Sequence, residues 1–142
     1  MGQADKALKP LLKEIKIAKK QPLAKVNKNL LDSYYFAGKA YLESGKPSKA
    51  RDILAKGAAM DSKDADIYYF LAKANMDLKK YTDAQKSLDY ALRLVPNFSE
   101  AMALKAQLYF VQGDKKRAET WNTKALSISP DNAEAKDLAK KL

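Results

Sequence analysis

The densest acidic cluster in the sequence consists of three aspartates, Asp61, Asp64 and Asp66. Carboxylates at this spacing could bind a calcium ion, which prefers oxygen ligands. The segment lacks the central glycine and the terminal glutamate of a calcium-binding loop, and it lies between two expected helices. Because aspartate stabilises a helix N-terminus by capping and by its charge, we interpret the cluster as helix capping and predict no metal site.

Catalytic and cofactor chemistry has little support elsewhere in the 142 residues. The chain contains no cysteine and no histidine, so it lacks a thiolate nucleophile, a Ser-His or Cys-His pair and the commonest zinc ligands. No glycine-rich phosphate-binding loop occurs in it. We therefore expect no enzyme activity, no catalytic residue and no cofactor.

The formal net charge of +10 is concentrated near the N-terminus. Residues 1–30 carry eight lysines and two acidic residues, which gives +6, and the remainder is close to neutral. No stretch is long and apolar enough for a membrane span, and no signal peptide is recognisable. These features favour a cytoplasmic location. An exported or membrane-anchored parent stays open if the N-terminus, including Met1 and Gly2, results from trimming.

Alignment of the chain with itself at a shift of 34 residues reveals three similar units, 31–64, 65–98 and 99–132. Three columns of this alignment contain only alanine or glycine. They are Gly38, Ala72 and Ala106; Ala50, Ala84 and Ala118; and Gly57, Ala91 and Ala125. Antiparallel helices approach closely only where both present small side chains, so these columns are expected to mark the contacts of helix pairs.

Each unit is expected to form two helices joined by a short turn. Apolar residues recur three and four positions apart on both sides of the turn, which is the spacing of one helix face. Gly45 and Gly113 lie in the turns, and Pro96 and Pro130 end second helices. The expected N-caps of the helices that follow these prolines are Asn97 and Asp131.

The period, the small columns and the turns resemble the tetratricopeptide repeat (TPR) family over residues 31–132. The matching residues of the second unit are Tyr68, Leu71, Ala72, Tyr81, Ala84, Ala91 and Pro96. Those of the third unit are Ala106, Tyr109, Gly113, Asp114, Ala118, Ala125 and Pro130. Lys105, where the family often has leucine, and Ser62, in place of a terminal proline, depart from the pattern. The nearest alternative is a 35-residue helical-pair repeat that reads RNA, and the uniform spacing of 34 argues against it.

The resemblance implies an all-α fold, a right-handed α-solenoid of antiparallel helix pairs. Three TPR-like repeats would occupy residues 31–132. Residues 133–142 would form a closing helix with a polar outer face. The basic segment 1–30 would be a cap on the array or the remnant of a preceding repeat.

Within the basic segment we expect an amphipathic helix over residues 10–20, with Pro10 in its first turn and Pro22 at its end. Residues 23–30 would either extend the next helix or form a connector. The apolar face of the amphipathic helix would consist of Leu11, Leu12, Ile15 and Ala18. A helix of this kind could also bind an anionic membrane surface or nucleic acid through residues 6–28.

In proteins that resemble this one, the first helix of each pair lines a concave groove that binds a segment of a partner. The residues that match this groove and that we expect to contact a partner are Tyr35, Lys39, Leu42, Tyr69, Lys73, Met76, Gln107 and Phe110. The aromatic residues would act as apolar anchors, and Lys39 and Lys73 would bind carboxylates. We interpret Phe36, Phe70 and Leu104 instead as packing between helices.

Chaperone-binding members of the family hold a terminal carboxylate with a clamp of Lys, Asn and Arg. The matching positions here are Tyr35, Lys39, Phe70, Asp66 and Leu104, so the clamp is absent. We therefore predict a non-enzymatic protein-interaction module whose partner is a protein or peptide segment, partly apolar with some acidic character, and not a chaperone C-terminus. The alternative functions are self-assembly into a homo-oligomer and binding of an anionic surface or nucleic acid through the N-terminal segment.

Overall fold

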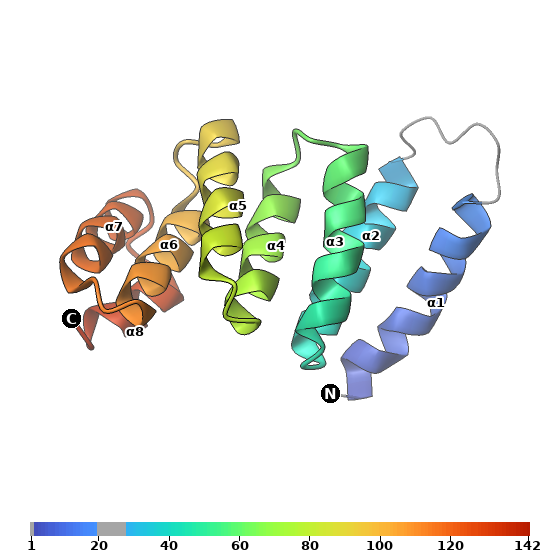
Figure 1. Ribbon diagram of the computed structural model, residues 1–142, viewed down its shortest axis with the longest axis horizontal. Coiled ribbons are helices and arrows are strands. Elements are labelled where there is room, and N and C mark those ends of the chain that lie inside the picture. The colour runs from blue at the N-terminus through green and yellow to red at the C-terminus, as the bar shows by residue number, and fades with distance from the viewer. Residues whose placement is uncertain (1, 20–27) are drawn as a thin grey trace.

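The computed structural model describes residues 2–19 and 28–142 (Figure 1). Within these two ranges the chain is all-α and contains no β-strand. Its helices are α1 (Gly2–Lys19), α2 (Lys28–Glu43), α3 (Pro47–Met60), α4 (Ala65–Asp77), α5 (Tyr81–Leu94), α6 (Ser99–Val111), α7 (Lys115–Ile128) and α8 (Ala133–Ala139). Among the described helices, none combines the length and the apolar character needed to cross a membrane.

The helices stack side by side in one elongated row from α1 to α8 (Figure 1). Helix α2 pairs with α3, α4 with α5 and α6 with α7, and the contacts α3–α4 and α5–α6 join the pairs. Three helices of one kind start at 34-residue intervals, at Ala65, Ser99 and Ala133. The helices of the other kind, α3, α5 and α7, start at the same interval, at Pro47, Tyr81 and Lys115. The predicted all-α solenoid of antiparallel helix pairs is confirmed.

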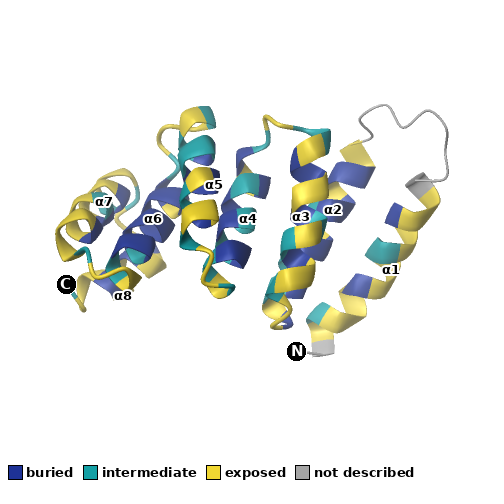
Figure 2. Cartoon of the chain, viewed as in Figure 1, coloured by how far each residue is buried: buried dark blue, intermediate teal, exposed yellow. Residues whose placement is uncertain are grey.

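The small residues of the three sequence columns lie where paired helices meet. All seven alanines in these columns have an exposed fraction of 0%, and Gly38 and Gly57 are buried too. The approach at Gly38 is very close, because a Cβ atom built there would lie 2.4 Å from Cδ2 of Leu54. Figure 2 shows buried residues on the facing sides of the helices and exposed residues on the outer sides. A column of small side chains is therefore what permits each pair to close.

The turns within the helix pairs share one backbone geometry. In the first, the amide of Lys46 donates to the carbonyl of Tyr41 over 2.8 Å, which closes the C-terminus of α2. This bond requires a left-handed residue, supplied by Gly45 with φ of 71° and by Gly113 with φ of 84°. In the second turn Lys79 adopts the same conformation with φ of 59°, although a side chain makes it less favourable.

The N-terminal helix is longer than predicted. It begins at Gly2, so Pro10 lies inside α1 and not in its first turn. Leu8 and Ile15, seven residues apart on one face, are buried against α2. Burial of this stripe offsets the helix hydrogen bond that proline cannot donate, a loss of about 3 kcal/mol. The stripe begins before Pro10, and this is why the proline does not mark the start of the helix.

Two further predictions concern the segment that follows α1. Residues 28–30 extend the helix of the first unit, because α2 starts at Lys28. The predicted stop at Pro22 lies outside the described residues, and so does the side chain of Ala18. That part of the predicted amphipathic helix stays a prediction.

The N-caps that follow the two prolines lie one residue later than predicted. They are Phe98 for α6 and Asn132 for α8, not Asn97 and Asp131. The buried side chain of Asn132 accepts a backbone N–H of α8 at 3.0 Å and donates to the hydroxyl of Ser99 at 3.0 Å. This second contact links two neighbouring first helices, which local spacing could not reveal.

The acidic cluster caps a helix, as predicted. Asp64 is the N-cap of α4, and its carboxylate accepts the backbone N–H groups of Asp66 and Ile67 at 3.0 and 3.2 Å. The carboxylate of Asp61 accepts the N–H of Lys63 at 2.9 Å and so shapes the preceding turn. Local backbone geometry accounts for both side chains.

Candidate functional site

One side of the array is lined by α2, α4, α6 and α8 and carries a series of hollows. Their volumes are about 530 Å³ between α1 and α2, about 230 Å³ between α2 and α4, and about 280 Å³ between α4, α6 and α8. Lys39 and Glu43 border both the first and the second hollow, so these two are contiguous. We call this surface the first-helix wall.

Most of the predicted partner-binding residues lie at these hollows. The second hollow is bordered by Lys39, Leu42 and Lys73, and the third by Met76, Gln107 and Phe110. Tyr35 is half-buried beside the second hollow, and its ring makes an edge contact with the ring of Phe70 at a centroid distance of 5.2 Å. Six of the eight predicted residues thus border two of the hollows, and Tyr35 contacts the ring of Phe70 at the second one.

Tyr69, the eighth, lies beneath the wall and not on it. Its exposed fraction is 8%, and its ring lies between those of Phe70 and Phe98 at centroid distances of 5.0 and 5.3 Å. Phe36 shows the opposite deviation, because it is 52% exposed and borders the first hollow instead of packing between helices. Leu104 is buried, in agreement with the packing interpretation.

Two lysines converge over one aromatic ring at the centre of the wall. The Nζ atoms of Lys39 and Lys73 lie 5.9 and 5.8 Å from the centroid of Phe70, one from α2 and one from α4. Neither lysine has an ion-pair partner within 4 Å among the described residues, although Glu43 and Asp77 border the same hollow. The negative face of the ring attracts both ammonium groups, and the ring of Tyr69, whose centroid lies 5.5 Å from Nζ of Lys73, attracts that lysine too. This arrangement suits a carboxylate that approaches from solvent.

A row of acidic residues, none of them among the predicted partner-binding residues, runs along the same helices. Its members are exposed and recur every 34 residues, at Asp32, Asp66, Glu100 and Glu134. Partial desolvation of its carboxyl by neighbouring groups, and then the negative charges of Asp64 and Glu100, raise the pKa of Asp66. The shift of 34 that revealed the small columns would also have revealed this row. Lys39 and Lys73 follow Asp32 and Asp66 by seven residues, about 10 Å along the helix, so the wall is acidic near one edge and basic at its centre.

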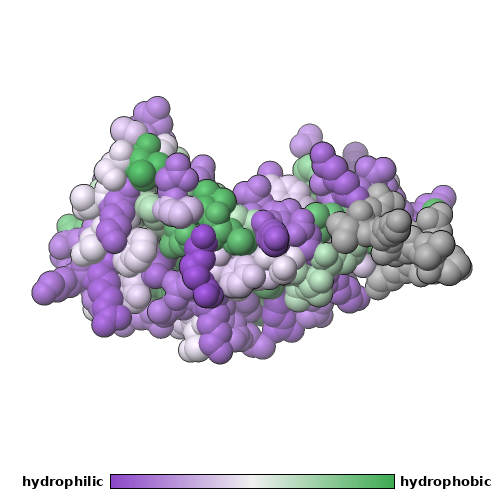
Figure 3. Space-filling model, turned by 90° about the horizontal axis from the view of Figure 1, so that it is seen from above, coloured by the Kyte–Doolittle hydropathy of each residue, from purple (hydrophilic) through white to green (hydrophobic). Residues whose placement is uncertain are grey.

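The edge of the molecule seen in Figure 3 carries a separate hollow of about 600 Å³. It lies between the α3–α4 turn and the α5–α6 turn, where Leu94, Val95 and Phe98 form the apolar part and Asp61 and Lys63 are polar neighbours. Hydrophobic side chains gather on this edge and are bordered by hydrophilic ones (Figure 3). None of the predicted partner-binding residues borders this hollow.

Because the side chain of Tyr69 is buried, we predict a loss of stability in alkaline solution. Burial, and then the charges of Glu134 and Glu100, raise the pKa of Tyr69 above its usual value of 10.0. The folded state therefore keeps the proton longer than the unfolded state, and the stabilisation is complete below pH 10 and declines as the pH rises toward the folded-state pKa. Between about pH 10 and 12, the free energy of unfolding should fall less steeply for Tyr69→Phe than for the intact chain. Urea unfolding at several pH values measures both slopes, with Tyr81→Phe as the control, and equal slopes for Tyr69→Phe and the intact chain would contradict the prediction.

Comparison with known families identifies the array. Models of the tetratricopeptide repeat match residues 35–84 and residues 75–142, and together they extend from α2 to the C-terminus. The chain belongs to the tetratricopeptide repeat family. The resemblance noted in the sequence is thereby confirmed.

Solved structures and one curated protein resemble this TPR chain. MamA superposes with a TM-score of 0.71 at 27% identity, over 85% of this chain and 70% of MamA. The first TPR of Spaghetti (RPAP3), bound to the HSP90 peptide SRMEEVD, superposes with a TM-score of 0.73 at 23% identity. The superposition covers 78% of this chain and 88% of that one, and at this identity the likeness concerns the fold alone. The human protein O-mannosyl-transferase TMTC3 is 32% identical over 71 residues, which are 49% of this chain and 8% of TMTC3. The chain thus spans a small part of that protein's length.

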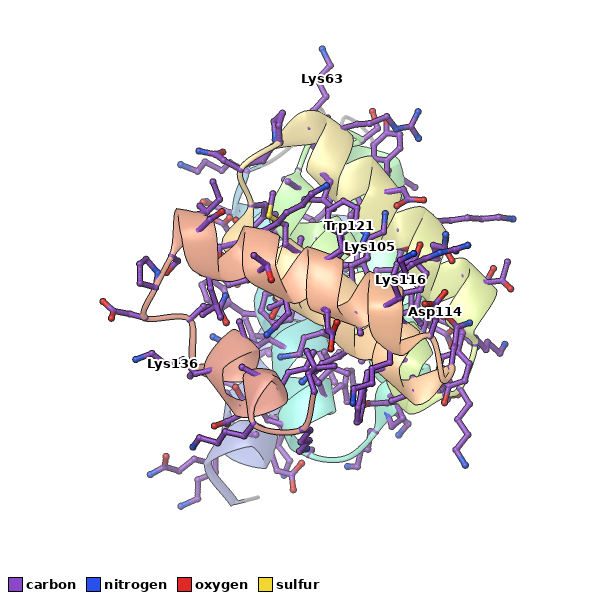
Figure 4. All side chains as sticks on the ribbon, turned by 90° about the vertical axis from the view of Figure 1, so that its left-hand side faces the viewer. Lys63, Lys105, Asp114, Lys116, Trp121 and Lys136 are labelled. Atoms are coloured by element: carbon purple, nitrogen blue, oxygen red, sulfur yellow. The ribbon has the colours of Figure 1, made fainter. Side chains whose placement is uncertain are left out.

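Lys105, the departure from the TPR pattern, forms a polar cluster between repeats. Its ammonium group pairs with the carboxylate of Asp89 on α5 and lies 4.2 Å from the ring centroid of Trp121 on α7. Figure 4 shows Lys105 and Trp121 next to each other between these helices. The Nζ atom of Lys124 lies 4.4 Å from the centroid of the same ring. A leucine position of the family is thus occupied by a buried lysine, which pairs with a partly exposed aspartate and lies against an indole ring.

Proposed function

We propose that this TPR chain is a non-enzymatic protein-interaction module that holds a partner segment against the first-helix wall. The observation that carries the proposal is the series of three hollows along α2, α4, α6 and α8, with aromatic rings and two lysines that lack an ion-pair partner among the described residues. The peptide bound to the first TPR of Spaghetti (RPAP3) supports peptide binding by a chain of this fold. The side chains that would contact the segment are Tyr35, Lys39, Leu42, Lys73, Met76, Gln107 and Phe110. Tyr69 would support them from below.

The charges of the wall indicate the chemistry of the segment. Its apolar side chains would occupy the hollows, and its acidic residues would bind Lys39 and Lys73. Acidic residues would be repelled from the row that includes Asp66 and Glu100, so any basic residues of the segment would point toward that edge. The partner we propose is therefore a partly apolar segment whose acidic residues follow the centre of the wall.

Peptides selected from a random library on the intact chain test this proposal. For a selected peptide, the double variant Lys39→Gln, Lys73→Gln should weaken binding by at least about tenfold, because two charge-assisted contacts are lost. Fluorescence anisotropy at two salt concentrations measures the dissociation constant and its salt dependence. Lys56→Gln, on an exposed face of α3, is the matched control and should leave binding unchanged.

Two outcomes of this experiment contradict the proposal. One is that no peptide is selected, and the other is that selected peptides bind the double variant as tightly as the intact chain. The peptide SRMEEVD is a further arm, since the clamp positions hold Tyr35, Phe70 and Leu104. We expect no micromolar binding of SRMEEVD, and such binding would overturn the predicted absence of a carboxylate clamp.

The alternative functions stay predictions. In α1, Leu8 and Ile15 pack on α2, so these apolar residues are not free to insert into a lipid surface. Lys6, Lys9, Lys13 and Lys16 remain exposed for an anionic surface or nucleic acid. A salt-dependent affinity that disappears on deletion of residues 6–28 would support that alternative. A strictly monomeric mass by light scattering at high concentration would exclude self-assembly.

A further inference from the structure

Helix α1 builds a hollow that the repeats by themselves would not form. On the α1 side the hollow is bordered by Ala4, Ala7 and Leu11, and on the α2 side by Phe36 and Lys39. The larger apolar residues of α1, Leu8 and Ile15, are buried against α2. The small side chains of Ala4 and Ala7 therefore leave space in front of Phe36, and the hollow has a volume of about 530 Å³.

Within one repeat column, the apolar side chain is least covered at the α1 end of the wall. Phe36, Phe70 and Leu104 occupy equivalent positions in successive units. Leu104 is buried and Phe70 is half-buried under Lys39 and Lys73, whereas Phe36 is 52% exposed. The exposed ring of Phe36 borders the α1–α2 hollow, so it offers apolar surface inside a concave site to a group from another molecule.

The neighbouring hollow adds a charge preference to this apolar site. It shares Lys39 with the α1–α2 hollow and contains Lys73, and both ammonium groups lie over the ring of Phe70. In an extended segment, residues two positions apart point to the same side about 7 Å from each other. One apolar residue and an acidic residue two positions away could therefore reach the two hollows together.

We propose that the α1–α2 hollow is the anchor site of the wall and that it binds one large apolar side chain of a partner protein. An acidic residue near that side chain in the partner sequence binds Lys39 and Lys73. The partner segment thus has an apolar–acidic motif, and α1 determines its register on the repeats. This inference rests on the proposed function, because it names the kind of segment that the first-helix wall binds.

Pools of short random peptides with two defined positions test the motif. One position is Leu, Trp or Ser, and a second position, one to four residues away, is Asp, Ser or Lys. Capture on the immobilised intact chain should enrich the pools that combine Leu or Trp with Asp. The dissociation constant of the best peptide is then measured for Ala7→Trp, which fills the hollow from an exposed position of α1, and for Ala55→Trp, the matched exposed control on α3.

The anchor site predicts at least about tenfold weaker binding for Ala7→Trp and unchanged binding for Ala55→Trp. Phe36→Ala, which alters the same hollow from α2, should weaken binding too, and circular dichroism checks that each variant is folded. Enrichment of pools without the apolar–acidic pair, or unchanged binding by both Ala7→Trp and Phe36→Ala, overturns this inference. If Lys39→Gln, Lys73→Gln still weakens binding in that case, the proposed function stands without the anchor site. If no pool is enriched, both fail.

Discussion

Replacement of Gly38 by alanine should lower the free energy of unfolding by about 1–2 kcal/mol, although alanine is the better helix former. A Cβ atom at this position would lie 2.4 Å from both Cγ and Cδ2 of Leu54, whose side chain is fully buried. Overpacking of this kind costs about 1–3 kcal/mol, and the helix propensity of alanine returns about 0.5–1 kcal/mol. The steric effect is expected to dominate because Leu54 has no free space into which to move.

A double-mutant cycle with Leu54→Ala separates these two effects. Leu54→Ala alone should cost about 2–5 kcal/mol, because it leaves a cavity between α2 and α3. In that background Gly38→Ala should be stabilising by about 0.5–1 kcal/mol, since the clash is gone and only the helix propensity remains. Urea unfolding of the four proteins measures the interaction energy.

The reversal of sign is the critical outcome of this cycle. The exposed substitution Ala55→Gly serves as control, because it should change stability only through helix propensity, by about 1 kcal/mol. If Gly38→Ala has the same effect in both backgrounds, the close approach at Gly38 does not limit the packing of α2 on α3. The small columns would then need another explanation.

The second large effect is expected at the partly buried ion pair of Lys105 with Asp89. Side-chain exposure is 10% for Lys105 and 43% for Asp89, so the lysine is desolvated much more than its partner. Asp89→Ala leaves the ammonium group without a counter-charge, which should lower the free energy of unfolding by about 1–2 kcal/mol, less than for a fully buried pair. Lys105→Met, which keeps the length of the side chain and removes the charge, should be neutral or stabilising by about 1 kcal/mol.

The combination of the two substitutions tests whether desolvation is the cause. In the Lys105→Met background Asp89→Ala should cost little, because no buried charge remains to be neutralised. Lys124→Met is the matched control, since its ammonium group also lies over Trp121 but its side chain is exposed. Thermal and urea unfolding measure all variants. A loss of more than about 2 kcal/mol for Lys105→Met would mean that the pair itself, and not apolar packing, stabilises the α5–α6 contact.

Much of the fold was predictable because the requirement for small side chains and for turn glycines is local and recurs in each unit. Ala72, Ala84 and Ala91 recur at equivalent places in each unit, since two helices joined by a short turn can close only on small side chains. Gly45 and Gly113 mark turns because the left-handed conformation suits glycine. The acidic row could have been predicted by the same comparison of units.

The candidate site was predicted less completely, because the exposure of a wall residue depends on what covers it. Tyr69 and Tyr35 are equivalent positions, yet Tyr69 is buried against Phe98 and Tyr35 is half-buried. Phe36 was assigned to packing and is exposed, because α1 presents small residues to it. Helix phase places each residue on a face, but the neighbouring element determines whether that face meets solvent.

The resemblance to the family, the 34-residue period and the assignment of the candidate residues to the first helix of each unit could all be obtained from the sequence. These properties follow from local stereochemistry and from side-chain size, and the same requirements recur in each unit. The extent of α1 across Pro10, the cap at Asn132 and the hollow beside Phe36 became evident only in the folded chain. Each of these features depends on contacts between residues far apart in the chain. The free energy of such contacts can outweigh the local conformational preferences on which predictions from sequence rest.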